Sequence, residues 1–156
     1  EREVDLRYIR TLGVCALLTA VLAVPAAAPA SASSPGHRAV ALVNKIRAKY
    51  GRRPLRVSGS LMRSSHRYAA YMLRHDYFGH LARISVSHRF RLAGEALALH
   101  YGGARSAHWV VRAWMHSPAH RAILMSGSYS WIGISAVRGR MGGHRAVTWV
   151  AHVGRK

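Results

Sequence analysis

The scarcity of carboxylates is the feature of this sequence that most restricts how the chain can fold. The chain holds 24 lysine and arginine residues against 5 aspartate and glutamate residues, and only Asp76 and Glu95 lie beyond residue 33. Internal ion pairs can therefore contribute little, and the cations must face solvent or an anionic partner. Candidate partners are nucleic acid, an anionic wall polymer and an acidic lipid surface. The alternative is a general arginine bias with mostly solvated faces, because the arginines are scattered along the chain.

Apolar packing must then hold the fold together. Half of the 156 residues are hydrophobic, which is enough for the core of one domain. The single cysteine, Cys15, cannot form an intramolecular disulfide, and it lies in a segment that we expect to be removed. The remaining part, about 120 residues, is long enough to be stabilised by its core alone. We therefore expect no disulfide-linked partner in the mature form.

The N-terminal segment has the organisation of a secretory signal. Arg7 and Arg10 precede an apolar run over residues 12–24, which Pro25 ends. Small residues follow and offer cleavage sites near residues 30–32. The alternative is an uncleaved N-terminal membrane anchor, because the apolar run is nearly long enough to span a bilayer.

Two parts of the chain follow from this interpretation. Residues 1–32 form a signal peptide, and residues 33–156 form a single domain that is secreted, either free outside the cell or associated with the cell wall. The second part shows no internal repeat and no low-complexity linker.

Hydrophobic spacing predicts helices first and a hairpin last. Helical periodicity covers residues 37–51, and Ser58 or Ser60 is placed to cap a second helix that ends at about Arg74. Two shorter helices follow over residues 104–117 and 117–125, the first with Ser106 placed to cap it and the second with a proline in its first turn. The β-rich runs at residues 130–137 and 144–153 flank a glycine-containing turn and predict a hairpin. This order indicates a layered α+β domain.

Few residues carry chemistry in this part of the chain. Glu95 lies among small apolar residues, so its carboxylate must be hydrogen-bonded, metal-bound or protonated. His80 closes the stretch "YFGH". His116 and His120 have the spacing of a ligand pair, but Pro118 begins a new helix between them, so we expect His116 to be an exposed bystander. No phosphate loop, nucleophile elbow or nucleic-acid motif appears.

Four blocks occur together in a familiar order: residues 42–73, "YFGH", "AGEALA" and "VVRAWMHSPAHRAILMSGSYSWIGISA". The sequence thereby resembles the bacterial branch of the CAP superfamily, also called SCP or cysteine-rich secretory protein, antigen 5 and pathogenesis-related 1. This resemblance implies a three-layer α-β-α sandwich with a central, mainly antiparallel sheet.

The resemblance also implies a cleft. Its matching residues here are His80, Glu95 and His120, and the two histidines of the family can hold a divalent metal, commonly zinc. Two departures affect the site. Many relatives have asparagine where this chain has Ala96, and some carry a second cleft glutamate shortly after the residue that matches Trp114, where none occurs here. A site of two histidines and Glu95 can still bind zinc if water completes the coordination.

Our first hypothesis is a protein that works mainly by binding at or beyond the cell wall. A small ligand or a metal would occupy the cleft. An anionic wall polymer or lipid would bind exposed arginines, for which the candidates are Arg52, Arg53, Arg138 and Arg140.

Three alternatives remain open. The chain is a zinc-assisted peptide or ester hydrolase, with His80 and His120 on the metal and Glu95 on it or acting as general base. It binds nucleic acid without specificity, although the secretory signal argues against that as a physiological role. In the third, Glu95 and the histidines are only a satisfied polar network that holds helix to sheet.

Overall fold

The computed structural model describes residues 34–103 and 106–156. The predicted signal segment, residues 1–32, lies outside the described residues. Four helices and four strands occur in the described part. In chain order they are α1 (Pro35–Lys49), β1 (Arg56–Val57), α2 (Gly59–Arg74), β2 (Leu92–Tyr101), α3 (Ala107–His116), α4 (Pro118–Met125), β3 (Trp131–Met141) and β4 (His144–Arg155).

The strands form one sheet in the order β1-β3-β4-β2. The long strands β3 and β4 form the predicted hairpin, and β2 pairs antiparallel to β4 along its whole length. Only the two-residue strand β1 runs parallel to its neighbour, β3. The sheet is therefore mainly antiparallel, as the family resemblance implied.

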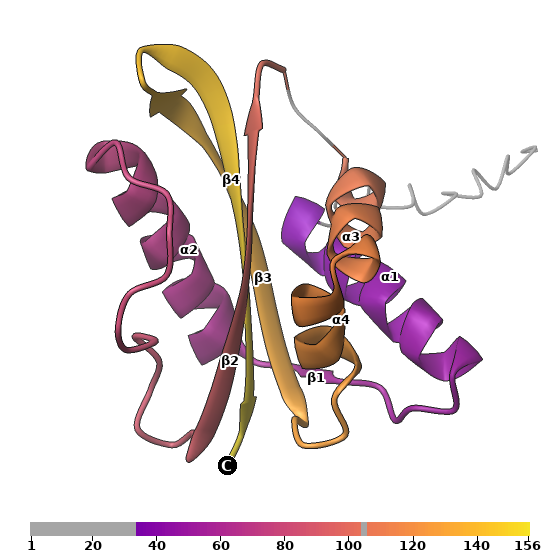
Figure 1. Cartoon of the computed structure of the whole chain (residues 1–156). Helices are drawn as coiled ribbons and strands as arrows, with labels where there is room; N and C mark the ends of the chain where they lie inside the picture. Colours follow the sequence, from indigo (N-terminus) through magenta and orange to yellow (C-terminus); the bar gives the residue numbers. More distant parts are fainter. Residues whose placement is uncertain (1–33, 104–105) are drawn as a thin grey trace, which may run out of the picture. The chain divides into compact units, whose positions relative to one another are not determined.

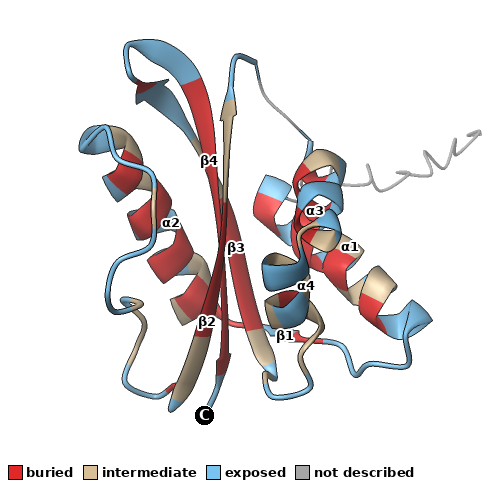
Figure 2. Ribbon diagram, in the orientation of Figure 1, coloured by how far each residue is buried: buried red, intermediate tan, exposed pale blue. Residues whose placement is uncertain are grey.

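Helices cover both faces of this sheet, so the predicted three-layer arrangement is confirmed. Helix α2 lies alone on one face, and α1, α3 and α4 lie on the other (Figure 1). Burial follows the layers: the red, buried side of each helix faces the sheet, and the blue side faces away from it (Figure 2). Alternate residues of the strands thus enter two separate apolar clusters.

The larger cluster joins α1, α3 and α4 to the sheet, and the smaller joins α2 to it. Trp114 and Trp149 are the largest side chains buried in the first, each 1% exposed. The second contains Tyr68 and Met72 of α2 against Leu97 and Val150 of the sheet. Burial of this apolar surface is the main stabilising term that a chain with so few carboxylates retains.

Glycines allow the helices to approach the sheet closely. A Cβ atom built on Gly133 would lie 2.2 Å from the Leu61 carbonyl carbon of α2, and one on Gly36 of α1 would lie 1.9 Å from the Ile134 carbonyl oxygen. Both contacts involve backbone, so neither can be relieved by a rotamer change. The two helix layers are therefore held at fixed positions on the two faces.

The helix boundaries agree with the sequence predictions. The Ser58 and Ser106 hydroxyls accept hydrogen bonds from the first turns of α2 and α3, and Pro118 begins α4. His116 is the exposed last residue of α3, so it and His120 belong to different helices, as the position of Pro118 predicted. None of the helices in the described part is long and apolar enough to cross a membrane.

Candidate functional site

Glu95 lies at the centre of a polar cluster on the α2 face of the sheet. It stands in the edge strand β2, directly opposite His152 of β4. Paired residues of adjacent strands place their side chains on the same face, so register alone brings these two together. Both are buried, Glu95 at 5% and His152 at 0% exposure. A bare carboxylate in such a position would be costly, and its partners therefore decide what it can do.

Two histidines hold the Glu95 carboxylate, one at each oxygen. His80 Nδ1 lies 2.7 Å from Oε1, and His152 Nε2 lies 2.8 Å from Oε2. The other nitrogen of His152, Nδ1, lies 2.8 Å from the Ser64 hydroxyl of α2. The result is a hydrogen-bonded chain that runs from buried Ser64 to His80, whose side chain is 57% exposed. Of the three alternatives that the sequence left open for Glu95, the structure shows hydrogen bonding.

The loop that carries His80 is held in place by hydrogen bonds to two successive backbone carbonyls. Tyr68 donates a hydrogen bond to the Gly79 carbonyl, and the Tyr77 hydroxyl donates to the His80 carbonyl at 3.0 Å. The loop leaves α2 through Asp76, which has the left-handed φ of 49° that aspartate tolerates better than most residues. The Tyr77 amide then bonds back to the Met72 carbonyl at 2.9 Å, which ends the helix with a Schellman-type turn.

Tyr68 links this loop to the buried end of the cluster. Its ring stacks on that of His152, with centroids 6.4 Å apart. Burial, together with the negative charge of Glu95, raises the pKa of Tyr68 to about 12. The phenol therefore remains protonated at physiological pH and can serve as the donor that the Gly79 carbonyl requires.

His120 approaches the same cluster from the opposite helix layer. It lies in the first turn of α4, which packs on β2, and its side chain is half-buried. Burial, together with the nearby His80, lowers the pKa of His120. No hydrogen bond joins His120 to His80 or Glu95 within the described residues. The structure thus brings His80 and Glu95 into contact and places His120 near His80.

A metal site needs several donor side chains placed around one point. Within residues 34–103 and 106–156, no three His, Cys, Asp or Glu side chains are placed to hold one. Both oxygens of Glu95 already accept from histidines, so in this conformation the carboxylate orients the imidazoles. The Nε2 atom of His80, with its Nδ1 held by a carboxylate, has the arrangement that is common behind metal-binding histidines. His80, held from behind by Glu95, and the nearby His120 are thus the two imidazoles that a metal would contact here, and its remaining ligands would have to come from solvent.

The four candidate arginines lie in two separate places. Arg52 and Arg53 line a cavity of about 730 Å³ at the start of β3, whereas Arg138 and Arg140 are exposed near the β3–β4 turn. Arg138 lies seven positions along β3 from Trp131, at the edge of that cavity, which corresponds to about 23 Å at the rise of an extended strand. The two pairs are thus distinct patches.

Sequence reasoning missed His152, Ser64 and Tyr68. The only local signal for His152 was a histidine inside an otherwise apolar strand run. Its partner could not be named without knowing that β4 pairs with β2 in this register. Ser64 and Tyr68 looked like ordinary positions on an amphipathic helix.

Comparison with known sequences identifies the family. The profile of the Cysteine-rich secretory protein family, CAP, matches residues 40–153. The uncharacterized protein YkwD of Bacillus subtilis is 29% identical over 119 residues. That match covers 70% of this chain and 45% of YkwD, so the chain spans less than half the length of this relative.

Solved structures agree on the fold. An outer surface protein of Borrelia burgdorferi superposes with a TM-score of 0.61 at 20% identity, covering 77% of this chain and 92% of that one. An extracellular SCP-domain protein of Bacillus anthracis gives 0.62 at 20% identity, covering 78% of this chain and 40% of that one. Schistosoma mansoni venom allergen-like protein 4 gives 0.57 at 13% identity, covering 80% and 92%. With the profile match over residues 40–153, the chain belongs to the CAP family of cysteine-rich secretory proteins.

Proposed function

We propose that this CAP domain is secreted and works by binding anionic polymer of the bacterial cell envelope. The proposal rests on one observation: the carboxylates of the described residues do not neutralise the positive charge of the lysines and arginines. The chain has a formal net charge of +19, and the two carboxylates of the described residues are already engaged, Glu95 by histidines and Asp76 by the Gly142 amide. Neither forms an ion pair with a lysine or arginine of the described part. The charge is therefore available to an external anion.

Two further observations support this location. Bacterial structures with the same fold are described as extracellular and outer-surface proteins. The N-terminal segment of this chain has the charge, apolar run and small residues of a signal peptide. A polymer of the envelope is then the polyanion that a secreted cationic domain meets first.

A sedimentation experiment tests the proposal. The protein is mixed with purified wall sacculi that carry their phosphodiester polymer, and with sacculi from which hydrofluoric acid has removed it. We expect binding to the intact sacculi, release as salt is raised from about 50 to 200 mM, and little binding to the stripped sacculi. Equal binding to both preparations, or binding that salt does not change, would reject an anionic polymer as the partner.

A zinc-assisted hydrolase is the second candidate, and the geometry at His80 favours it. Glu95 fixes Nδ1 of His80, which leaves Nε2 at a solvent-exposed ring, and His120 has a lowered pKa that keeps its imidazole neutral. Neutral, oriented imidazoles are suited to hold zinc. A zinc ion there would act as a Lewis acid on a peptide or ester carbonyl.

Calorimetry followed by an activity assay tests the hydrolase. Zinc is titrated into wild type, His80→Gln and His120→Gln, with the exposed His116→Gln as the matched control. If the protein is a zinc-assisted hydrolase, we expect only wild type and the control to bind zinc. We also expect zinc-dependent cleavage of an ester or peptide, which His120→Gln abolishes. Equal zinc binding by all four proteins would rule out the zinc-assisted hydrolase, and the polar cluster around Glu95 would then be structural.

A further inference from the structure

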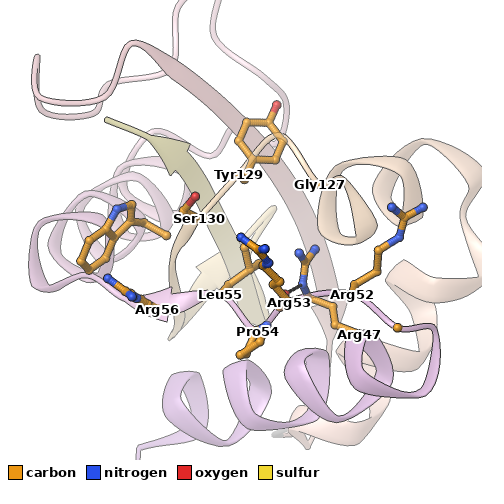
Figure 3. Close-up of a pocket in the computed structure, with 11 residues that line it drawn as sticks. Arg47, Arg52, Arg53, Pro54, Leu55, Arg56, Gly127, Tyr129 and Ser130 are labelled. Carbon is orange, nitrogen blue, oxygen red and sulfur yellow. Dashed lines mark hydrogen bonds between the residues drawn. The ribbon is translucent and has the colours of Figure 1, made fainter.

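A cavity beside α1 and β1 is lined by four arginines. Arg47, Arg52, Arg53 and Arg56 come from α1 and the segment that follows it, and Gly127, Tyr129 and Ser130 come from the connection between α4 and β3, which faces them (Figure 3). Its volume is about 730 Å³, well within the range of ligand sites.

Arg47 places a fixed positive charge at the buried side of this cavity. It is 1% exposed, and its guanidinium donates to backbone carbonyls alone: Nε to Arg53 at 2.8 Å, and Nη1 to Leu124 at 2.7 Å and to Ser126 at 3.0 Å. The last two are carbonyls at the end of α4 that no further helical turn can satisfy. These bonds hold the guanidinium in place and leave its charge without a counter-ion among the described residues.

The arginines also repel one another. Burial, together with the charge of nearby Arg52, lowers the pKa of Arg47. Arg56 and Lys156 both lie over the ring of Trp131, at 5.8 Å and 4.2 Å from its centroid, so a further cation adjoins the cavity. An anion bound there would relieve this concentration of like charge.

The segment that carries Arg52 and Arg53 forms one side of the cavity, and hydrogen bonds within the protein already hold it in place. Gly51 ends α1 with a left-handed φ of +64°, and the Arg52 amide bonds back to the Arg47 carbonyl at 2.9 Å. Asn44 then pairs with both backbone groups of Leu55, at 2.8 and 2.9 Å. A segment fixed at both ends loses little conformational entropy when it binds, which favours affinity.

From this arrangement we infer that the cavity is a binding site for the phosphate groups of a polyol-phosphate chain. Arginine forks match phosphate oxygens in pairs, and a volume of 730 Å³ exceeds what one phosphate ion fills, so it accepts a phosphodiester segment. A single-stranded nucleic acid stacks successive bases on several free aromatic faces, and of the two aromatic rings at the cavity, Tyr129 and Trp131, the second already carries two cations. The inference rests on the proposed function and names the site and the ligand chemistry for it.

The test uses a short synthetic glycerol phosphate oligomer as the probe. Its affinity is measured for the whole chain and for the double variant Arg52→Gln/Arg53→Gln. This variant removes the charge of two exposed arginines and keeps the backbone hydrogen bonds that hold their segment in place. The matched control is Arg63→Gln/Arg67→Gln, an equal charge change on α2, across the sheet. Circular dichroism and thermal unfolding confirm that both variants fold.

We expect the cavity variant to bind about tenfold more weakly or worse, and its salt slope to fall by about 0.7 for each phosphate group that the protein no longer neutralises. The control should change by less than about threefold. An equal decrease in both variants would mean diffuse attraction and would overturn the cavity as the site. Retained binding to intact sacculi in the cavity variant would do the same while leaving the proposed function standing.

Two further probes distinguish the source of the phosphate. Vesicles that contain phosphatidylglycerol present the same group on a membrane surface, and an oligonucleotide of equal charge presents it on a nucleic acid. Tighter binding of the soluble oligomer than of either, with weaker binding by the cavity variant, supports the inference. Tighter binding to vesicles or to the oligonucleotide would overturn the assignment to a polyol-phosphate chain.

Discussion

Replacing Glu95 with glutamine removes the negative charge that both His80 and His152 contact, with almost no change in shape. The cost follows from the burial of each partner. His152 and Glu95 have side chains 1% and 4% exposed, so their charge-assisted hydrogen bond is worth about 1.5–3 kcal/mol. The His80 side chain is 57% exposed, and solvent screening limits its contribution to about 0.5 kcal/mol.

Glutamine recovers part of this energy. Its amide oxygen can still accept one hydrogen bond, but its NH₂ group must then face the second histidine, which also presents a donor unless its tautomer changes. Since about 1 kcal/mol of neutral hydrogen bonding survives, we expect the free energy of unfolding to fall by about 2 kcal/mol.

Urea denaturation followed by tryptophan fluorescence measures this difference. Asp76→Asn is the matched control, because Asp76 is the other carboxylate of the described residues, is exposed, and accepts from the Gly142 amide as asparagine also can. Asparagine tolerates the left-handed backbone found there. A Glu95→Gln variant within about 0.5 kcal/mol of wild type would refute the argument that the cluster stabilises the fold.

Three further predictions concern single positions. Because the fold lowers the pKa of His120 below its ordinary value of about 6.5, the unfolded chain binds a proton at this histidine at a higher pH than the folded chain does. The free energy of unfolding should therefore decrease as the pH is lowered from 7 to the lowered pKa. This decrease should be smaller in His120→Gln than in the control His116→Gln. Gly133→Ala should cost about 3 kcal/mol in urea denaturation because its Cβ meets the backbone of α2; a decrease below about 1 kcal/mol would show that α2 can move. Gly51→Ala should cost about 1–2 kcal/mol through its positive φ, whereas Gly103→Ala, in open space, should be nearly neutral by thermal unfolding.

Much of the fold followed from local patterns. Local signals predicted the cap of α2, at Ser58 or Ser60, and the cap of α3 at Ser106, and the structure has Ser58 and Ser106 there. The start of α4 at Pro118 and the terminal hairpin were also predicted, because each is encoded within a few residues. The layering came from the order of these elements and from the family resemblance. Such features depend on short-range hydrogen bonding and periodicity, which a single sequence displays.

The site could be predicted only in part. Glu95, isolated in an apolar run, indicated that it needs a partner, and the family blocks pointed to His80 and His120. The central role of His152 depends on a strand register between residues 57 positions apart, which no local pattern encodes. The basic cavity was hidden for a similar reason: Arg47 looked like one more exposed helical arginine, and its burial depends on carbonyls at the end of α4.

Whether this CAP domain binds an anionic envelope polymer through its unneutralised charge is decided by how its affinity for the polymer depends on salt concentration. The dissociation constant for the glycerol phosphate oligomer is measured between about 50 and 200 mM salt, and its logarithm is plotted against that of the salt concentration. We expect a straight line whose slope corresponds to several neutralised phosphates. A flat line, or no measurable binding at low salt, would contradict it.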